Sequence, residues 1–316
     1  MTIDPQAKKL LELAKAAGVP EMWQLTPDQA REEYLKRTAK TKPQVDIFKV
    51  EDREIPGPNG GISVRIYSPR SLESHESLPA LVWFHGGGFV IGDLESHDSA
   101  CRELANKAEC IVVAVDYRLA PEHKFPSAVD DCYAALEWVF EQASRLQVDI
   151  KKIAVGGDSA GGNLAAVVAL LARDSSEIQI CFQLLIYPCV APEPETRSHH
   201  QFANGYLLTR KTITWFFQHY LRNAKDAYDP RYAPLEAEDL TDLPPSLVLV
   251  AGFDPLRDEG IEYARSMIEA GNRVSLINYE GMIHGFFLMG AVLDEANRAV
   301  KESARQLREI FLEVDQ

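Results

Sequence analysis

The sequence lacks any long apolar segment and has few cysteines. No run approaches the roughly 20 apolar residues that a membrane-spanning helix needs. Charges are scattered through the N-terminal residues, unlike the apolar stretch of a secretory signal peptide. The five cysteines are odd in number and show no CxxC spacing, so they indicate neither a disulfide framework nor a metal site. We therefore expect a cytoplasmic protein without a membrane partner, whose thiols are small buried groups.

Positively charged residues are outnumbered by negatively charged ones. The chain carries 33 Lys and Arg against 47 Asp and Glu, a formal net charge of −14. An acidic protein repels phosphate backbones and anionic lipid heads, which argues against nucleic acid as a partner and favours a neutral small molecule. The sequence also lacks repeats, low-complexity tracts and Gly/Ser linkers. Its 316 residues, 46% of them hydrophobic, suit one large α/β domain or two ordinary ones.

Strands and helices alternate over most of the chain. Segments 46–57 and 61–69 alternate apolar and polar residues, as an antiparallel pair with one solvated face does. Beyond them, continuous apolar strands are separated by helical patterns, which indicates a mostly parallel sheet covered by helices on both faces. We expect strands at 80–84, 110–116, 152–157, 180–187, 246–252 and 273–279, and helices near 97–108, 127–146, 160–173, 257–270 and 294–314.

Two regions depart from this alternation. Residues 1–44 show two helical patterns, which begin after the capping residues Asp4 and Thr26. Residues 190–235 contain prolines, histidines and a helical pattern at 209–221, but no clear strand. Ligands bind at the carboxyl edge of such sheets, so we interpret this second region as an insertion packed over that edge.

The strongest local motif is Gly-Asp-Ser-Ala-Gly at 157–161, between an apolar strand and an Ala-rich helix. It is the GxSxG nucleophile elbow in the context that this motif requires. The residues two before and two after the serine crowd each other in so tight a turn, and glycine fits there. The turn would lift the Ser159 hydroxyl to the positive end of the helix. An ordinary N-cap serine is the alternative, so Ser159 as nucleophile depends on partners elsewhere.

A second glycine-rich motif, HGGG at 85–88, directly follows the apolar strand 80–84. Three successive glycines let the backbone approach a ligand and aim its N–H groups at one point, as the oxyanion hole of an acyl-transfer enzyme requires. One donor comes from the residue after the nucleophile, here Ala160, and the rest from this loop. We interpret His85 as a structural histidine that ties the loop to nearby backbone, and not as the general base.

His284 is the candidate general base. It follows the last apolar strand, in the Gly-flanked segment 280–286 that we expect to be a loop at the carboxyl edge of the sheet. A base at that edge can reach the serine hydroxyl. The other histidines after Ser159 lie in or near the region without strands: His199, His200 and His219.

The acid that orients the base should follow the preceding strand. The segment 252–259 offers two aspartates there, Asp254 and Asp258. We favour Asp254, which comes directly after the strand; its alternative role is to cap the helix that starts at Pro255. Asp258 would lie about one helical turn further along, where it could form a salt bridge or support the loop.

Together these motifs closely resemble the hormone-sensitive-lipase-like family of bacterial carboxylesterases, in the α/β-hydrolase superfamily. The resemblance covers nearly the whole chain from Val45 onward. It rests on five motifs in the family's order: HGGG at 85–88, DYRLAPEHKFPSAVDD at 116–131, GDSAGGNLAA at 157–166, DPLRDEG at 254–260 and HGF at 284–286.

The resemblance implies an α/β-hydrolase fold with a helical cap. Residues 1–44 would form the N-terminal part of the cap, on a catalytic domain at 45–316 that carries the cap insertion at about 190–225. The triad would be Ser159 as nucleophile, His284 as base and Asp254 as the orienting acid. The oxyanion hole would use the N–H groups of Gly87, Gly88 and Ala160. Tyr117, Arg118 and Pro121 match a segment that braces the site.

The expected activity is hydrolysis of short- to medium-chain carboxylic esters through an acyl-enzyme, with a small-molecule ester as the partner and with no metal or organic cofactor. Amide or peptide hydrolysis by the same triad is the alternative, since the pocket selects the leaving group. Plant gibberellin receptors resemble the family without its catalytic histidine, which makes a non-catalytic receptor a weaker alternative because His284 is present. A homodimer is left open. We expect the pocket walls to include Phe202, Tyr206, Leu207 and Leu208. Packing within the helical core is the alternative role for some of them.

Overall fold

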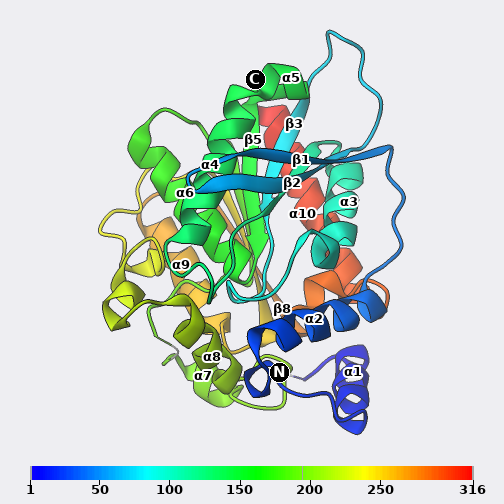
Figure 1. The fold of residues 1–316 in the computed structure, drawn as a ribbon, viewed down its shortest axis with the longest axis vertical. Helices are drawn as coiled ribbons and strands as arrows, with labels where there is room; N and C mark the ends of the chain where they lie inside the picture. The colour runs from blue at the N-terminus through cyan, green and yellow to red at the C-terminus, as the bar shows by residue number, and fades with distance from the viewer. Residues whose placement is uncertain (1, 194, 315–316) are drawn as a thin grey trace.

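An eight-stranded sheet runs through the centre of the protein in the computed structural model, which describes residues 2–193 and 195–314 (Figure 1). The strand order is β1-β2-β4-β3-β5-β6-β7-β8. The β1–β2 and β2–β4 pairs are antiparallel and the other pairs are parallel. The antiparallel β1–β2 pair and the mostly parallel sheet are as predicted, whereas the prediction did not include the antiparallel β2–β4 pair. The strands are β1 (Lys49–Gly57), β2 (Gly60–Ser68), β3 (Leu78–Phe84), β4 (Ile111–Asp116), β5 (Val148–Asp158), β6 (Phe182–Ile186), β7 (Ser246–Phe253) and β8 (Val274–Ile283).

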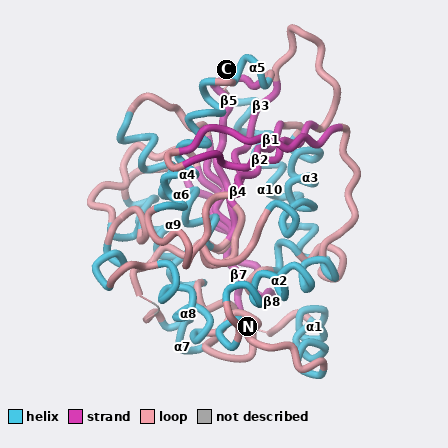
Figure 2. The backbone as a smooth tube through the Cα atoms, in the orientation of Figure 1, coloured by secondary structure: helices cyan, strands magenta, loops and turns pink. Residues whose placement is uncertain are grey.

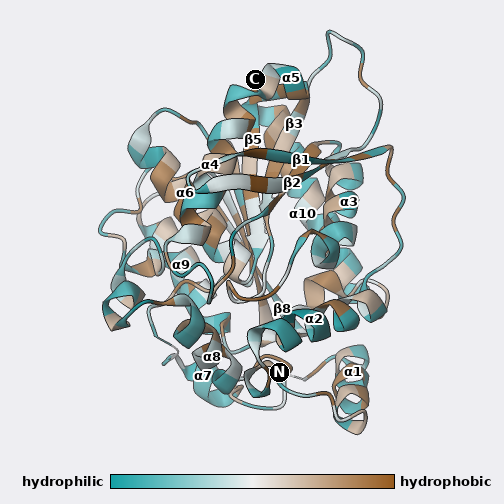
Figure 3. Ribbon diagram, viewed as in Figure 1, coloured by the Kyte–Doolittle hydropathy of each residue, from teal (hydrophilic) through white to brown (hydrophobic). Residues whose placement is uncertain are grey.

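Helices cover both faces of the sheet. One face is covered by α3 (Leu94–Ala108) and α10 (Asp294–Glu313), and the other by α4 (Ser127–Glu141), α6 (Ala160–Ser175) and α9 (Arg257–Glu269). Successive side chains of a strand point to opposite faces. In β4, accordingly, Val113 lies in one buried cluster and Val112 in the other. Figure 3 shows hydrophobic residues along the strands, whereas the outer helix α2 is largely hydrophilic.

Several boundaries differ from the prediction, and β5, for example, begins four residues earlier than expected, at Val148. The helix expected at 127–146 is interrupted at Gln142 and continues as the short α5 (Ala143–Leu146). The last strand does not end at residue 279, and the loop expected at 280–286 is wrong: β8 continues to Ile283. A Cβ on Gly252 would lie 2.0 Å from the carbonyl oxygen of Glu280, so only a glycine lets β7 and β8 approach this closely at the irregularity in their register, between Ala251 and Phe253.

The N-terminal helices begin where the capping residues indicate. Asp4 accepts hydrogen bonds from the N–H groups of the first turn of α1 (Pro5–Ala16). Thr26 and Gln29 form a reciprocal capping box at the start of α2 (Pro27–Thr41). A short 3₁₀ turn, η1 (Met22–Gln24), lies between the two helices.

The second irregular region is helical as well. It contains α7 (Arg197–Gln201), α8 (Arg210–Tyr220) and the 3₁₀ turns η2 (Ala224–Tyr228) and η3 (Pro234–Glu236). Figures 1 and 2 show α1, α2, α7 and α8 gathered at the lower end of the sheet. The hydroxyl of Thr209, just before α8, donates to the Glu21 carboxylate at 2.8 Å, so the two regions are in direct contact.

Candidate active site

Ser159 occupies a strained turn between β5 and α6. Its backbone angles are φ 56° and ψ −118°, a combination that residues with a side chain rarely adopt. A Cβ on Gly161 would lie 1.9 Å from the carbonyl oxygen of Phe84, and a Cβ on Gly157 would lie 2.4 Å from the carbonyl carbon and oxygen of Gly161. Glycine at both places is therefore what allows the turn to close and the serine to stand at the start of α6.

Three side chains from three different strand ends form one chain of hydrogen bonds. His284 Nε2 lies 2.9 Å from Ser159 Oγ, and His284 Nδ1 lies 2.8 Å from Asp254 Oδ2. Asp254 directly follows β7 and is fully buried, and His284 directly follows β8. This arrangement orients the imidazole so that one nitrogen faces a carboxylate and the other faces the hydroxyl.

Asp258 points elsewhere. Its Oδ2 accepts the N–H of Ser198 at 2.9 Å, and its Oδ1 accepts from Arg257 Nε at 2.8 Å. Asp258 therefore holds the first turn of α7 against α9. Of the two aspartates proposed from the sequence, Asp254 is the one that the structure brings to His284.

The glycine loop after β3 lies beside Ser159. Gly87 and Gly88 have positive φ angles of 124° and 59°. None of the hydrogen bonds within residues 2–193 and 195–314 uses the N–H of either glycine. Ala160 is the first residue of α6, where an N–H has no acceptor within the helix. All three residues line the same cavity as Ser159, so their N–H groups are available near its hydroxyl.

His85 holds the loop in place. Its Nδ1 donates to the Gly86 carbonyl at 2.8 Å, and its ring stacks on Tyr117 with centroids 4.2 Å apart. The Tyr117 hydroxyl donates to the His85 carbonyl at 2.6 Å. Burial lowers the pKa of His85 to about 4, so the ring is neutral near pH 7. Next to Tyr117, the Arg118 guanidinium is anchored on Asp131 at 2.7 Å.

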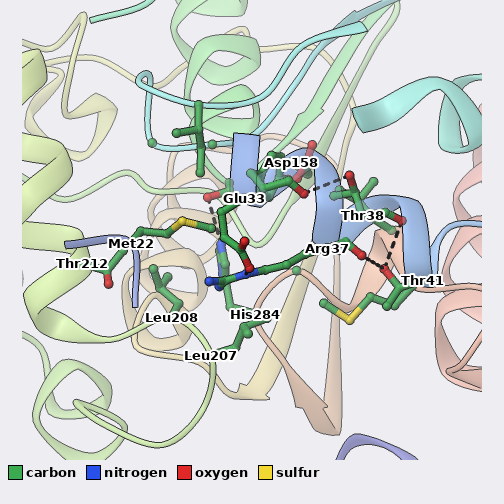
Figure 4. Close-up of a pocket in the computed structure, with 18 of the residues that line it drawn as sticks. Met22, Glu33, Arg37, Thr38, Thr41, Asp158, Leu207, Leu208, Thr212 and His284 are labelled. Atoms are coloured by element: carbon green, nitrogen blue, oxygen red, sulfur yellow. Dashed lines mark hydrogen bonds and ion pairs between the residues drawn. The ribbon is translucent and has the colours of Figure 1, made fainter. Parts of the chain in front are cut away.

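A cavity of about 490 Å³ opens over Ser159 and His284. Figure 4 shows Met22, Leu208 and His284 pointing into it. Its lining is mostly apolar and comes from η1 and the N-terminal helices, from the region around α8, and from the segment after β8. Examples from these three sources are Leu10, Leu13 and Met22; Leu208, Ile213 and Phe216; and Leu288, Met289 and Val292.

Two of the four proposed wall residues do not line this cavity. Leu207 and Leu208 do, but Phe202 and Tyr206 pack into a separate cluster with Phe253 and Ile283. They fill the space between the 190–235 region and the ends of β7 and β8. Packing, the alternative role given for some of the four residues, is therefore the role of these two aromatic side chains. The N-terminal helices contribute to the cavity, as expected of a cap, but the sequence prediction named no wall residue from them; the apolar residues of α1 and η1 are the signal that could have indicated these.

Three further findings concern metal binding, membrane-spanning helices and the cysteines. In the described parts of the chain, no three His, Cys, Asp or Glu side chains are grouped so that they could hold a metal ion. No helix among residues 2–193 and 195–314 has the length and apolar character needed to cross a membrane. All five cysteines are free thiols.

The sequence matches a family model described as alpha/beta hydrolase fold over residues 81–288. The carboxylic ester hydrolase LipN of Mycobacterium tuberculosis is 42% identical over 292 residues, which cover 90% of this chain and 77% of that protein. The ethyl acetate hydrolase of Pseudomonas putida is 36% identical over 307 residues, which cover 95% of this chain and 96% of that protein.

Solved structures give the same result. An ester hydrolase from the metagenome of Lake Arreo, complexed with a derivative of bipyridine phosphonate, has a TM-score of 0.94 and 42% identity, covering 98% of this chain and 99% of the other. The hyperthermophilic esterase of Pyrobaculum calidifontis has a TM-score of 0.93 and 42% identity with the same coverage. The chain therefore belongs to the alpha/beta hydrolase family that its motifs predict, in the hormone-sensitive-lipase-like group of carboxylesterases.

Proposed function

We propose that this protein hydrolyses short- to medium-chain carboxylic esters through an acyl-enzyme on Ser159. The observation that carries the proposal is the chain of hydrogen bonds from Asp254 through His284 to Ser159, at 2.8 and 2.9 Å, beside an apolar cavity. Such a chain activates a serine for nucleophilic attack. Relatives named for the hydrolysis of carboxylic esters, including ethyl acetate, support an ester as the substrate.

In the first half of the reaction, His284 Nε2 takes the proton of Ser159 as Oγ attacks the ester carbonyl. Asp254 holds the imidazole with its Nδ1 proton toward the carboxylate and stabilises the imidazolium that forms. The N–H groups of Gly87, Gly88 and Ala160 would donate to the oxyanion. The alcohol leaves with the proton from His284. Water, deprotonated by His284, then releases the acid and restores the serine hydroxyl.

We propose that residues 1–44 and about 190–225 act as a cap on the catalytic domain 45–316; residues 1 and 194 lie outside the described residues. The contact between Thr209 and Glu21 and the apolar side chains that both regions contribute to the cavity support this. A cavity of about 490 Å³ suits a short or medium acyl chain.

We also propose a cytoplasmic location, which the five free thiols support.

Initial rates on p-nitrophenyl esters of increasing acyl length, beside the anilide of the best acyl group, test the proposal. We expect butyrate or hexanoate to be best, dodecanoate to be slower and the anilide to be nearly inert. Ser159→Ala should fold and lose turnover, and an organophosphate should label Ser159 in the wild type. A faster anilide would favour the amide alternative, and full activity in Ser159→Ala would refute the nucleophile.

A further inference from the structure

A second histidine–carboxylate pair lies beside the candidate active site, and one member, Asp158, lines the same cavity as Ser159. His97 is on α3 and Asp158 is the last residue of β5, and both are buried. His97 Nε2 lies 3.0 Å from Asp158 Oδ1. Neither side chain belongs to the Ser159–His284–Asp254 chain, and the hydrolysis proposed above uses neither. Burying a pair of this kind costs desolvation free energy, which only good contacts offset. The groups that contact the pair therefore indicate what it does in the fold.

The pair binds the start of the glycine loop. The N–H of Gly86 donates to Asp158 Oδ1 at 3.0 Å and lies 3.2 Å from His97 Nε2. If His97 Nε2 carries the proton, two N–H groups donate to the same oxygen, Asp158 Oδ1: that of His97 Nε2 and that of the Gly86 backbone. Nδ1 then faces the Ser96 hydroxyl at 2.9 Å, and the same hydroxyl lies 2.8 Å from the carbonyl oxygen of Asp93.

The carboxylate is charged in this environment. Burial acts to raise the pKa of Asp158, but the contact with His97 and the N–H of Gly86 lower it more, so that it lies below its ordinary value. A charged acceptor makes stronger hydrogen bonds than a neutral one. Asp158 can therefore hold Gly86 firmly, and His97 is the side chain that stabilises and orients the carboxylate.

The fit around Gly86 leaves little freedom. A Cβ on Gly86 would lie 2.4 Å from Asp158 Oδ2, so the carboxylate lies against the α-carbon of this glycine. On the other side, a Cβ on Gly92 would lie 2.3 Å from the Gly86 carbonyl oxygen. The peptides that follow contain the N–H groups of Gly87 and Gly88, and their directions depend on where Gly86 is fixed.

Asp158 is also the residue before Ser159. One carboxylate thus connects the glycine loop, which carries the oxyanion donors, to the elbow, which carries the nucleophile. We infer that His97 is a positioning residue: through Asp158 and Gly86 it fixes the N–H groups of Gly87 and Gly88 relative to the Ser159 hydroxyl. This inference rests on the proposed ester hydrolysis for its kinetic consequences, but its structural consequence does not depend on turnover.

The test compares His97→Leu, which removes the donor at similar volume, with His97→Gln, whose amide can still donate to Asp158. On p-nitrophenyl butyrate we expect His97→Leu to lower kcat about 10- to 100-fold, less than or equal to the loss of a whole oxyanion donor. KM should change less than about twofold, because the pocket is untouched. A trifluoromethyl ketone, which forms an oxyanion on the serine, should bind weaker by a similar factor. His97→Gln should recover most of both losses.

Leu104→Ala is the matched control. Leu104 is fully buried on the same helix, α3. It belongs to the apolar cluster between the sheet and helices α3 and α10, which contains no residue of the glycine loop. It should lower the melting temperature without changing kcat at 25 °C. If His97→Leu destabilises the protein as much as Leu104→Ala and keeps the wild-type kcat and ketone affinity, His97 is merely structural and the inference is wrong.

If His97→Leu does not fold, Asp158→Asn weakens the same hydrogen bonds and should lower kcat by a larger factor than it changes KM, because Asp158 also lines the cavity. A crystal structure of either variant should show residues 86–88 displaced relative to Ser159, and an unmoved loop would overturn the inference even without an active substrate. An inactive wild-type protein on the whole ester panel would refute the proposed function alone.

Discussion

Asp254 Oδ2 lies 2.8 Å from His284 Nδ1, and the other oxygen of the same carboxylate accepts the N–H of Leu256 at 2.9 Å. The carboxylate is therefore fixed from two sides in a fully buried position. Because its orientation is set by backbone, it can in turn set the orientation of the imidazole. This relationship separates Asp254 from Asp258, which contacts α7 and not the histidine.

Asp254→Asn should reduce kcat by about 10⁴, because an amide at this place favours the wrong imidazole tautomer. Asp258→Asn should lose far less, since its carboxylate only supports the start of α7. Both variants should keep the wild-type circular dichroism spectrum, which checks that they fold. The assignment of the acid is wrong if Asp258→Asn is the inactive variant and Asp254→Asn turns over normally.

The fold could be predicted from the sequence to a large extent because its signals are local. Continuous apolar strands separated by helices indicate the covered parallel sheet, and the glycines around Ser159 mark a turn that few other residues permit. Chain order then points to His284 and Asp254, because strand ends of a parallel sheet meet at one edge. The family resemblance predicts the same residues.

The rest depends on contacts between segments that are distant in sequence. Phe202, Tyr206 and Leu208 are all large side chains with an apolar body, and only the packing of the region against Phe253 decides which of them face the cavity. Likewise, nothing local to His97 indicates that it reaches Asp158. Strand β8 is longer than its apolar pattern because Gly252, on the neighbouring strand, permits a close approach.

Gly161→Ala should prevent the elbow from closing. The added Cβ would lie 1.9 Å from the Phe84 carbonyl oxygen, and backbone on the central strands cannot move aside cheaply. We expect a loss of about 3 kcal/mol or more in the free energy of unfolding, or no folded protein. In the control, Gly61→Ala, the new Cβ meets the exposed, flexible Glu54 side chain, so the loss should stay within about 1 kcal/mol. Urea titrations compare the two.

Leu208→Trp should shorten the range of accepted acyl chains. The larger side chain takes space from the cavity that Leu208 lines, while its partly exposed position leaves room for the change. We expect kcat/KM for octanoate relative to acetate to fall about tenfold or more, because one methylene in a pocket is worth about 10- to 200-fold. Tyr206→Phe, two residues away and packed outside the cavity, should leave this ratio unchanged. An unchanged ratio in Leu208→Trp would argue against an acyl chain at this wall.

A buried carboxyl beneath the 190–235 region should make stability depend on pH. Glu259 Oε1 accepts the N–H groups of Val190 and Ala191, and Oε2 lies 3.2 Å from His199 Nε2. Burial raises the pKa of Glu259 to about 8 and lowers the pKa of His199 to about 4. At a pH between these values both groups are neutral, so that a protonated Oε2 of Glu259 would donate to His199 Nε2. His199 Nδ1 can then donate to Thr196 Oγ1 at 2.7 Å.

A carboxyl whose pKa is higher in the folded than in the unfolded protein contributes stability below its unfolded value, near 4.5, and loses it as the pH rises through about 8. Glu259→Gln keeps the same hydrogen bonds and cannot ionise. Between pH 5 and pH 8 the wild type should therefore lose about 2–4 kcal/mol of unfolding free energy relative to Glu259→Gln, at about 1.4 kcal/mol per pKa unit. Urea titrations at both pH values measure this difference. Glu262→Gln, an exposed position on the same helix, should follow the wild type at both pH values. Parallel pH dependence in the wild type and Glu259→Gln would mean that Glu259 is already ionised in the folded protein at pH 5.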